Sequence, residues 1–208
     1  MKKCSLLLIL LTTQTAMAAT STNLAVTGLI EPPSCDIAVG ASDFDVGDIS
    51  VGMLSRNAEV RLPDQTTPLT IVCAGPTLVG IRGTDNRAGT ASSVKDVRFG
   101  LGLDISGNKI GWYEFEVPVS GLAIDGQAGF VASSDTNGTT WASPFPRYVG
   151  TQANYILSFS TVSSSAPSPF STMSGTMRLA TAIAPYSTLN TSAEIHLDGS
   201  ATLTLIYL

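Results

Sequence analysis

The sequence predicts an all-β protein with a sandwich or barrel architecture. Short apolar or alternating runs recur along the chain, and pairs such as Asp125-Gly126 and Asn137-Gly138 separate them as turns. The 19 glycines and 11 prolines argue against a helical protein, and no long window combines a helical period with capping residues. Many short strands at this spacing are typical of a β-sandwich or a β-barrel.

The N-terminus has the features of a secretory signal peptide. Lys2 and Lys3 precede the unbroken apolar run Leu6–Leu11, and Ala16-Met17-Ala18 has the small-x-small pattern of a cleavage site. We therefore expect residues 1–18 to be removed on export. The apolar run is shorter than the roughly 20 residues that span a bilayer, and no later run is long enough, so no transmembrane segment is expected after cleavage.

The composition of the expected mature chain, residues 19–208, limits its partners. Without the two N-terminal lysines, nine basic residues face sixteen acidic ones, which gives a net charge of −7. Nucleic acid is not an expected partner, because phosphate binding needs a basic surface. Only 13% of the residues are charged, against about 25% in typical soluble domains. A surface of this kind suits a protein that packs against copies of itself.

Several segments are predicted as strands from their apolar pattern. In Tyr113–Val117 the apolar residues alternate with Glu114 and Glu116, which predicts a half-buried strand. Met173–Ala184 comes closest to a helical period, but it contains Gly175 and several threonines, and a strand fits it as well. The Ser- and Pro-rich stretch Ser160–Ser174 is predicted to be an exposed loop. The other predicted strands are Thr70–Cys73, Leu78–Ile81 after a Gly75-Pro76 turn, Val97–Leu103 and Tyr155–Phe159.

Two cysteines, Cys35 and Cys73, remain after signal removal. An exported protein folds in an oxidising compartment, so we expect a disulfide that joins the first strand to the end of the second. The alternative is a pair of free buried thiols. Closing a loop of this length would stabilise the fold by roughly 3–4 kcal/mol in the chain-entropy model.

The sequence contains no convincing catalytic, cofactor or metal motif, and we do not expect an enzyme. His196, on a predicted strand, is the single histidine, and no Gly-x-Ser-x-Gly elbow accompanies it. Gly100-Leu101-Gly102 lacks the third glycine and the helix of a dinucleotide site. Asp43, Asp45 and Asp48 do not match a calcium loop, and a solvated turn explains them better.

Three aromatic residues, Trp112, Trp141 and Tyr148, could form a platform on which a sugar stacks. Aromatic side chains in β-sandwiches more often fill the core. We therefore favour the core position, and a sugar-binding surface remains the alternative.

Three features occur in a fixed order. The first is the segment Asn23–Ile30, in which Leu24, Val26 and Gly28 share one parity. The second is the pair of cysteines. The third is the C-terminal run Ala201–Leu208, in which Leu203, Leu205 and Tyr207 alternate and the tyrosine is the penultimate residue.

Together these features resemble the subunits of chaperone–usher fimbriae of Gram-negative bacteria. Those subunits have a short N-terminal extension, a Gly-x-Ile/Val segment before the first cysteine, a second cysteine some 40 residues on, and a last strand that ends with a penultimate tyrosine. The pattern fits residues 19–73 and 200–208. In the middle of the chain, Asp85-Asn86-Arg87, Phe99–Gly102 and Ile110-Gly111 resemble a narrower subgroup, carried as a domain of unknown function and labelled β-fimbrial major subunit.

The resemblance implies a fold and a mechanism. Family subunits are immunoglobulin-like sandwiches that lack their final strand, so a hydrophobic groove stays open. A periplasmic chaperone fills the groove first, and at the outer-membrane usher the extension of another subunit replaces it. By this resemblance, residues 19–27 are a donor strand with Leu24, Val26 and Gly28 as its contacts. Residues 28–208 are the domain, and Leu203, Leu205 and Tyr207 face the groove and the chaperone.

The expected function is therefore a structural fimbrial subunit that polymerises by donor-strand exchange and serves in cell adhesion or biofilm formation. It would pass through the periplasm and end in the fimbrium on the cell surface, with no cofactor. The extension is short, which leaves a minor or tip subunit open. The second hypothesis is a secreted β-sandwich adhesin that binds carbohydrate or a host protein. For Asp85-Asn86-Arg87 the sequence gives a turn with a structural arginine and no functional role.

Overall fold

The computed structural model describes residues 21–29, 34–142, 147–163 and 166–208. The chain divides into two units, residues 1–32 and 33–208. The predicted signal peptide lies outside the described residues. In the first unit, residues 21–29 form neither a strand nor a helix. Among the described residues, no helix has the length and apolar character needed to span a membrane.

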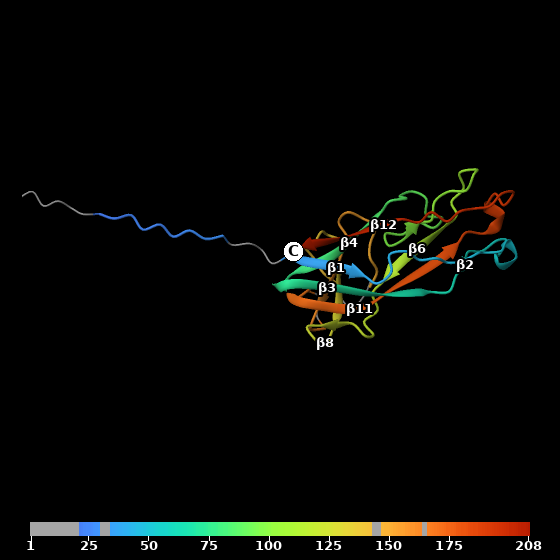
Figure 1. Cartoon of the computed structure of the whole chain (residues 1–208). Coiled ribbons are helices and arrows are strands. Elements are labelled where there is room, and N and C mark those ends of the chain that lie inside the picture. Colours follow the sequence, from blue (N-terminus) through green and yellow to red (C-terminus); the bar gives the residue numbers. More distant parts are fainter. Residues whose placement is uncertain (1–20, 30–33, 143–146, 164–165) are drawn as a thin grey trace, which may run out of the picture. The chain divides into compact units, whose positions relative to one another are not determined.

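The second unit is a β-sandwich of two antiparallel sheets, which confirms the all-β prediction (Figure 1). The first sheet has the order β1-β3-β11-β6-β5, formed by Cys35–Val39, Gln65–Thr77, Phe170–Ile183, Gly111–Glu116 and Phe99–Gly100. The second has the order β12-β4-β10-β9, formed by Ala201–Tyr207, Val79–Asp85, Ile156–Ser160 and Phe130–Ser134. Three short strands, β2 (Val60–Arg61), β7 (Ala123–Ile124) and β8 (Gln127–Ala128), attach to the first sheet, and two 3-10 turns, η1 (Val51–Met53) and η2 (Tyr186–Thr188), complete the unit.

The core lies between the two sheets and follows the period of two along each strand. On β3, Leu69, Ile71 and Cys73 point inward and are buried. On β6, Tyr113 and Phe115 do the same, and the two rings meet edge to face with centroids 5.4 Å apart. One connected apolar cluster therefore holds the sheets together.

Three predicted boundaries are wrong. The strand expected over Val97–Leu103 is only β5, Phe99–Gly100. Gly75-Pro76 is not the turn after the second strand, because β3 continues to Thr77 and the chain turns at Leu78. The ladder between β3 and β11 changes register between Phe170 and Thr172. A proline, which cannot donate to a ladder, is tolerated at such an irregularity. The expected loop 160–174 is also shorter than predicted, because β11 begins at Phe170, which is fully buried.

The strand β6 is not half-buried as predicted, since all six of its residues are buried. Glu114 and Glu116 lie on the outer face of the sheet, where four arginines cover them. Glu114 pairs with Arg61 at 3.2 Å and lies 3.8 Å from Arg98. Glu116 pairs with Arg147 at 3.0 Å and with Arg178. Buried carboxylates need such partners, because an unpaired buried charge is strongly destabilising.

The predicted disulfide between Cys35 and Cys73 is confirmed. The two residues lie directly opposite each other in the β1–β3 ladder, with Cα atoms 4.0 Å apart and 38 residues of separation. The second strand in the chain is the short β2, and Cys73 lies in the third strand, β3, four residues before its end at Thr77. The bridge ties β1, an outer strand of its sheet, to the sandwich.

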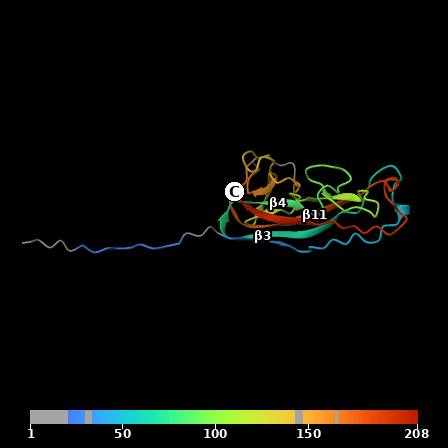
Figure 2. The same ribbon diagram turned by 90° about the horizontal axis from the view of Figure 1, so that it is seen from above.

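The second unit has two distinct ends. Strand β12 ends beside the start of β1, and we call this the Tyr207 end. The turns η1 and η2 lie at the opposite end, which we call the η1 end (Figure 1). The view from above places the same segments at opposite ends (Figure 2).

Candidate functional site: a groove between two unpaired sheet edges

The strands β1 and β12 are the outer strands of the two sheets. Among the described residues, each pairs on one side only: β1 with β3, and β12 with β4. They approach each other at the Tyr207 end, where the backbone N–H of Cys35 donates a hydrogen bond of 2.9 Å to the Tyr207 hydroxyl. The sandwich therefore presents two free edges along the same side.

The side chains on these edges alternate between the core and the solvent. On β12, Leu203 and Leu205 are half-buried and pack on the core, while Thr202 and Thr204 are exposed. Tyr207 has the parity of the leucines, but its side chain is 52% exposed. This is the alternation predicted from the sequence for the last strand.

On β1, Ile37 and Val39 are likewise half-buried and pack on the core. Both sheet edges thus leave apolar side chains only partly covered. Partial burial of this kind is uncommon for isoleucine and leucine inside a finished core.

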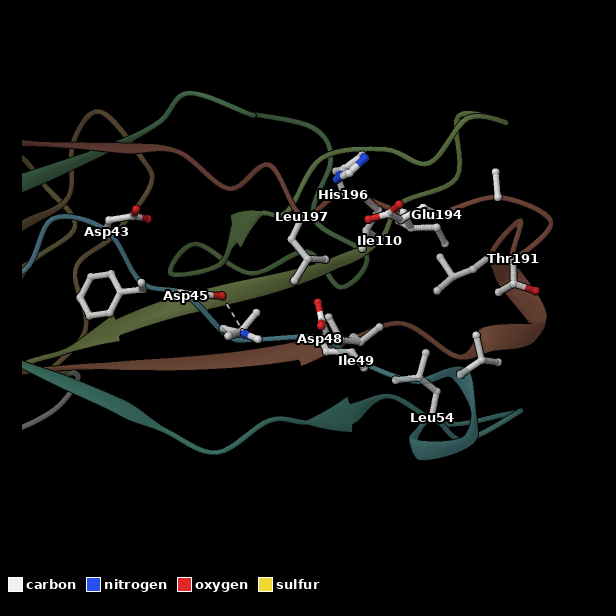
Figure 3. A pocket seen from close by; sticks show the side chains of 18 residues that line it. Asp43, Asp45, Asp48, Ile49, Leu54, Ile110, Thr191, Glu194, His196 and Leu197 are labelled. Carbon is white, nitrogen blue, oxygen red and sulfur yellow. Dashed lines mark hydrogen bonds between the residues drawn. The ribbon is translucent and has the colours of Figure 1, made fainter.

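Two extended stretches continue these edges toward the η1 end. Residues 43–49 follow β1, and residues 189–200 precede β12; neither is paired into a sheet in the described part of the chain. Phe44 and Ile49 on the first stretch, and Ile195 and Leu197 on the second, pack partly against the core. In Figure 3, Leu197 points toward the stretch that carries Asp45 and Asp48.

Two cavities lie in sequence between the stretches. The first, of about 620 Å³, lies toward η1 and is floored by Ile110 and Ile183. The second, of about 280 Å³, lies toward β12 and is floored by Tyr113, Phe115 and Leu179 among others. Because the cavities share residues of both walls, they form one groove between residues 42–54 and 189–201, and the free edges of β1 and β12 continue its two walls toward the Tyr207 end.

The rim of the groove near η1 is acidic. Asp43, Asp45, Asp48 and Glu194 are exposed there, and Asp45 accepts a hydrogen bond of 2.8 Å from the N–H of Gly47 (Figure 3). This is a turn of the predicted kind, since Gly47 has a φ of 71°. In the described residues, no group of three or more His, Cys, Asp or Glu residues lies close enough together to hold a metal ion.

His196 lies on the wall of this groove, but not on a strand, so that sequence prediction is wrong. Its side chain is exposed, and in Figure 3 it points away from the facing wall while Leu197 points toward it. The His196 side chain therefore lies on the solvent-facing side of an extended segment.

The turn Asp85-Asn86-Arg87 fastens the 189–200 wall. Arg87 donates from Nε to the Asp198 carbonyl at 3.0 Å and from Nη2 to the Asp198 carboxylate at 2.8 Å. These contacts raise the pKa of Arg87 and lower that of Asp198, chiefly through the side-chain hydrogen bond. Asn86 donates to the hydroxyls of Ser200 and Thr202. The sequence suggested a structural arginine, and its partner is this wall.

A second fastening lies nearer η1. The carboxylate of Asp104 accepts hydrogen bonds from the N–H of Asn190 at 2.6 Å and from the N–H groups of Ser106 and Asn108 at 2.9 Å each. The hydrogen bond from Asn190 is the largest contribution that lowers the pKa of Asp104 from 3.8 to about 2. The carboxylate therefore ties the 189–200 wall to the loop before β6.

The predicted donor segment lies in the first unit. Leu24 and Val26 are 90% and 94% exposed. A Cβ atom added at Gly28 would meet no atom within 4 Å. The segment thus has two uncovered apolar side chains of the same parity.

Trp112, Trp141 and Tyr148 do not together form an exposed platform for a sugar. Trp112 is 1% exposed, with the Arg98 guanidinium 3.6 Å from the ring centroid and Glu59 accepting its indole N–H at 3.0 Å. Trp141 and Tyr148 are half-buried, and the Trp141 indole N–H donates to the Gly138 carbonyl at 3.0 Å. Trp112 belongs to the buried charged cluster on the outer face of β6.

A family described as "Protein of unknown function (DUF1120)" matches residues 24–105. The match includes both cysteines, the 43–49 wall and the Asp85-Asn86-Arg87 turn. The family is uncharacterised, and its description names no fimbrial subunit. None of the curated proteins compared with the chain matches it.

Proposed function

We propose that this protein is a structural subunit of a chaperone–usher fimbria that polymerises by donor-strand exchange. The observation that carries the proposal is the pair of free sheet edges, β1 and β12, which leave apolar side chains only partly covered and continue into the groove. An edge strand exposes a row of unpaired N–H and C=O groups that can pair with another strand. One added strand would hydrogen-bond these groups and cover the half-buried Leu203 and Leu205.

The segment that fits the groove chemically is residues 19–27 of another copy or of a related subunit. It has no charged residue, and its exposed Leu24 and Val26 share one parity. Burying each of them in the groove would contribute roughly 1.5–3 kcal/mol, in addition to the backbone hydrogen bonds. Gly28 suits a place where two backbones approach closely, because it has no side chain to accommodate.

The same physics implies the partners. A subunit with an open apolar groove and a free edge would aggregate, so we propose that a periplasmic chaperone lends it a strand and an outer-membrane usher receives the complex. Exchange of that strand for a subunit's extension joins copies head to tail, and such contacts produce filaments when they do not close. The resulting fimbrium at the cell surface would act in adhesion or biofilm formation.

A peptide of residues 19–29 tests this proposal directly. We expect it to bind the purified protein and to slow amide hydrogen exchange along β12 and the start of β1, because both edges gain a partner. The same peptide with Leu24→Asp and Val26→Asp is the matched control and should leave exchange unchanged. Equal effects of the two peptides, or protection at sites outside the groove, would contradict donor-strand binding.

A further inference from the structure

The β1–β3 ladder determines which backbone groups of β1 are free. The N–H of Ala74 donates to the Ser34 carbonyl at 2.9 Å, just outside the pair of Cys35 and Cys73. A bond in this position flanks a pair that does not hydrogen-bond to itself, and such pairs alternate along an antiparallel ladder. The N–H and C=O groups that point away from β3, toward the free edge, are therefore those of Cys35, Ile37 and Val39.

The β12–β4 ladder leaves the matching groups free on the other edge. The N–H of Leu208 donates to the Leu78 carbonyl at 3.0 Å, just outside the pair of Tyr207 and Val79. By the same alternation, the backbone groups that face the free edge of β12 belong to Ala201, Leu203, Leu205 and Tyr207. Free groups thus recur at every second residue on both edges, and they allow an added strand several registers that differ by two residues.

The Tyr207 side chain crosses from one edge to the other. Its hydroxyl accepts the hydrogen bond of 2.9 Å from Cys35, whose N–H is the first free-edge donor of β1. The side chain is 52% exposed, so the hydroxyl contact rather than burial holds the ring across the gap. Because β1 starts and β12 ends here, the next free N–H groups toward the η1 end are those of Ile37 and Leu205.

The predicted donor segment does not define one register by itself. Residues 19–27 contain no charged residue, and the face of Leu24 and Val26 carries no third large apolar side chain. A shift by one residue would turn both side chains away from the core. A shift by two residues keeps both on the same face. A feature of the groove must therefore select among the registers that differ by two residues.

We propose that Tyr207 is the end stop of the groove and fixes the register of the strand that binds there. The inference rests on the proposed function, in which this strand is residues 19–27 of another copy or of a related subunit. The tethered ring occupies the Cys35 N–H and the space beside it. The strand then pairs from Ile37 and Leu205 toward the η1 end and extends no further the other way. Every junction thereby adopts the same register, which a filament with a regular repeat requires.

Two substitutions of Tyr207 test the stop. Tyr207→Phe removes the hydroxyl that tethers the ring, and Tyr207→Ala removes the ring as well. Because the side chain is half exposed, neither change should unfold the protein. Tyr186→Phe is the matched control, since Tyr186 is also partly exposed and lies in η2, at the opposite end. Residue-resolved amide exchange is measured by NMR on the purified protein, free and with the peptide of residues 19–29. A nitroxide on the N-terminus of the peptide reports its register.

In the free protein, the Cys35 amide should exchange about 2- to 12-fold faster in both Tyr207 variants than in wild type, the range expected for the loss of one hydrogen bond. In wild type, the peptide should slow the Ile37 and Leu205 amides but not the Cys35 amide, and the nitroxide should broaden one set of signals. In Tyr207→Ala, the peptide should slow the Cys35 amide as well, and the nitroxide should broaden a second set, shifted by two residues. Tyr186→Phe should behave as wild type.

Three results would refute the stop while the proposed function stands. The first is an unchanged Cys35 amide in free Tyr207→Phe, which would mean that the hydroxyl is no tether. The second is slowing of the wild-type Cys35 amide by the peptide as strong as that of Ile37, which would mean that the strand displaces the ring. The third is a single wild-type register in Tyr207→Ala. If the wild-type protein does not bind the peptide, the proposed function fails and the stop fails with it.

Discussion

Removing the disulfide should weaken the groove more than the rest of the sandwich. The perturbation is the double substitution Cys35→Ala and Cys73→Ala. Alanine is chosen over serine because it places no hydroxyl at the buried Cys73 position. A loop of 38 residues corresponds to about 4 kcal/mol in the chain-entropy model. For a chain of this size, that loss lowers the melting temperature by about 8–16 °C.

The effect should be concentrated on β1 because that strand has few other attachments. It pairs with β3 over five residues and has no partner on its other edge in the described chain. Once the bridge is absent, local opening of β1 costs less than global unfolding. One wall of the groove is then lost part of the time, and the affinity for any strand that uses it falls.

Hydrogen exchange with the peptide of residues 19–29 measures both effects. In the variant, amides of β1 should exchange faster than those of β11 by a larger factor than in wild type, and the peptide should bind more weakly. If β1 and β11 change by the same factor, or if the peptide affinity is unaltered, the bridge does not act on the groove and this reasoning is wrong.

Three further predictions test the edge, the charged cluster and the wall. Leu205→Asp should destabilise the protein by about 2–3 kcal/mol, because it places a charge against the core, whereas Thr204→Asp should change stability by less than about 0.5 kcal/mol; similar melting temperatures would contradict the assigned faces. Glu116→Ala should lower the free energy of unfolding in urea by about 3 kcal/mol, since it removes the buried partner of two arginines. Asp64→Asn, which removes an exposed partner of Arg178, should lower it by less than about 1 kcal/mol. Asp104 has a lowered pKa in the folded state, so its contribution to the free energy of unfolding is present above pH 4 and is lost as the pH falls toward 2. Asp104→Asn should therefore make the free energy of unfolding fall less steeply between pH 4 and pH 2. An unchanged fall over this range would refute the assignment.

The sequence predicted the parts of the structure that depend on local patterns. The all-β class follows from the turn residues and the strand periods, and the disulfide follows from two cysteines in an exported chain. The opposite faces of Leu203 and Thr202 follow from parity alone. Each of these signals lies within a few residues or depends on composition.

The burial of Glu114 and Glu116 could not be read from their own strand. Their arginine partners come from four separate places in the chain, at positions 61, 98, 147 and 178. An alternating apolar and acidic run is the ordinary pattern of a strand with one face in water. Only the tertiary structure brings the cations onto that face and replaces the water.

The groove walls were missed for a related reason. Residues 43–49 and 189–200 have no sheet partner in the described chain, so their sequences carry turn and polar signals beside a few apolar residues. The alternation of Ile195 and Leu197 extends the parity of Leu203 and Leu205. That continuity is the signal that could have identified the 189–200 wall.

The way the walls are held distinguishes a built groove from a poorly packed region. The disulfide and the β3 ladder hold β1 from its outer side. Arg87 and Asp104 hold the 189–200 wall through Asp198 and Asn190, again from outside the groove. The inner edges, by contrast, have no strand partner in the described part of the chain. These ties fix each wall from outside the groove, so a strand that entered the groove would find its hydrogen-bonding partners already in place.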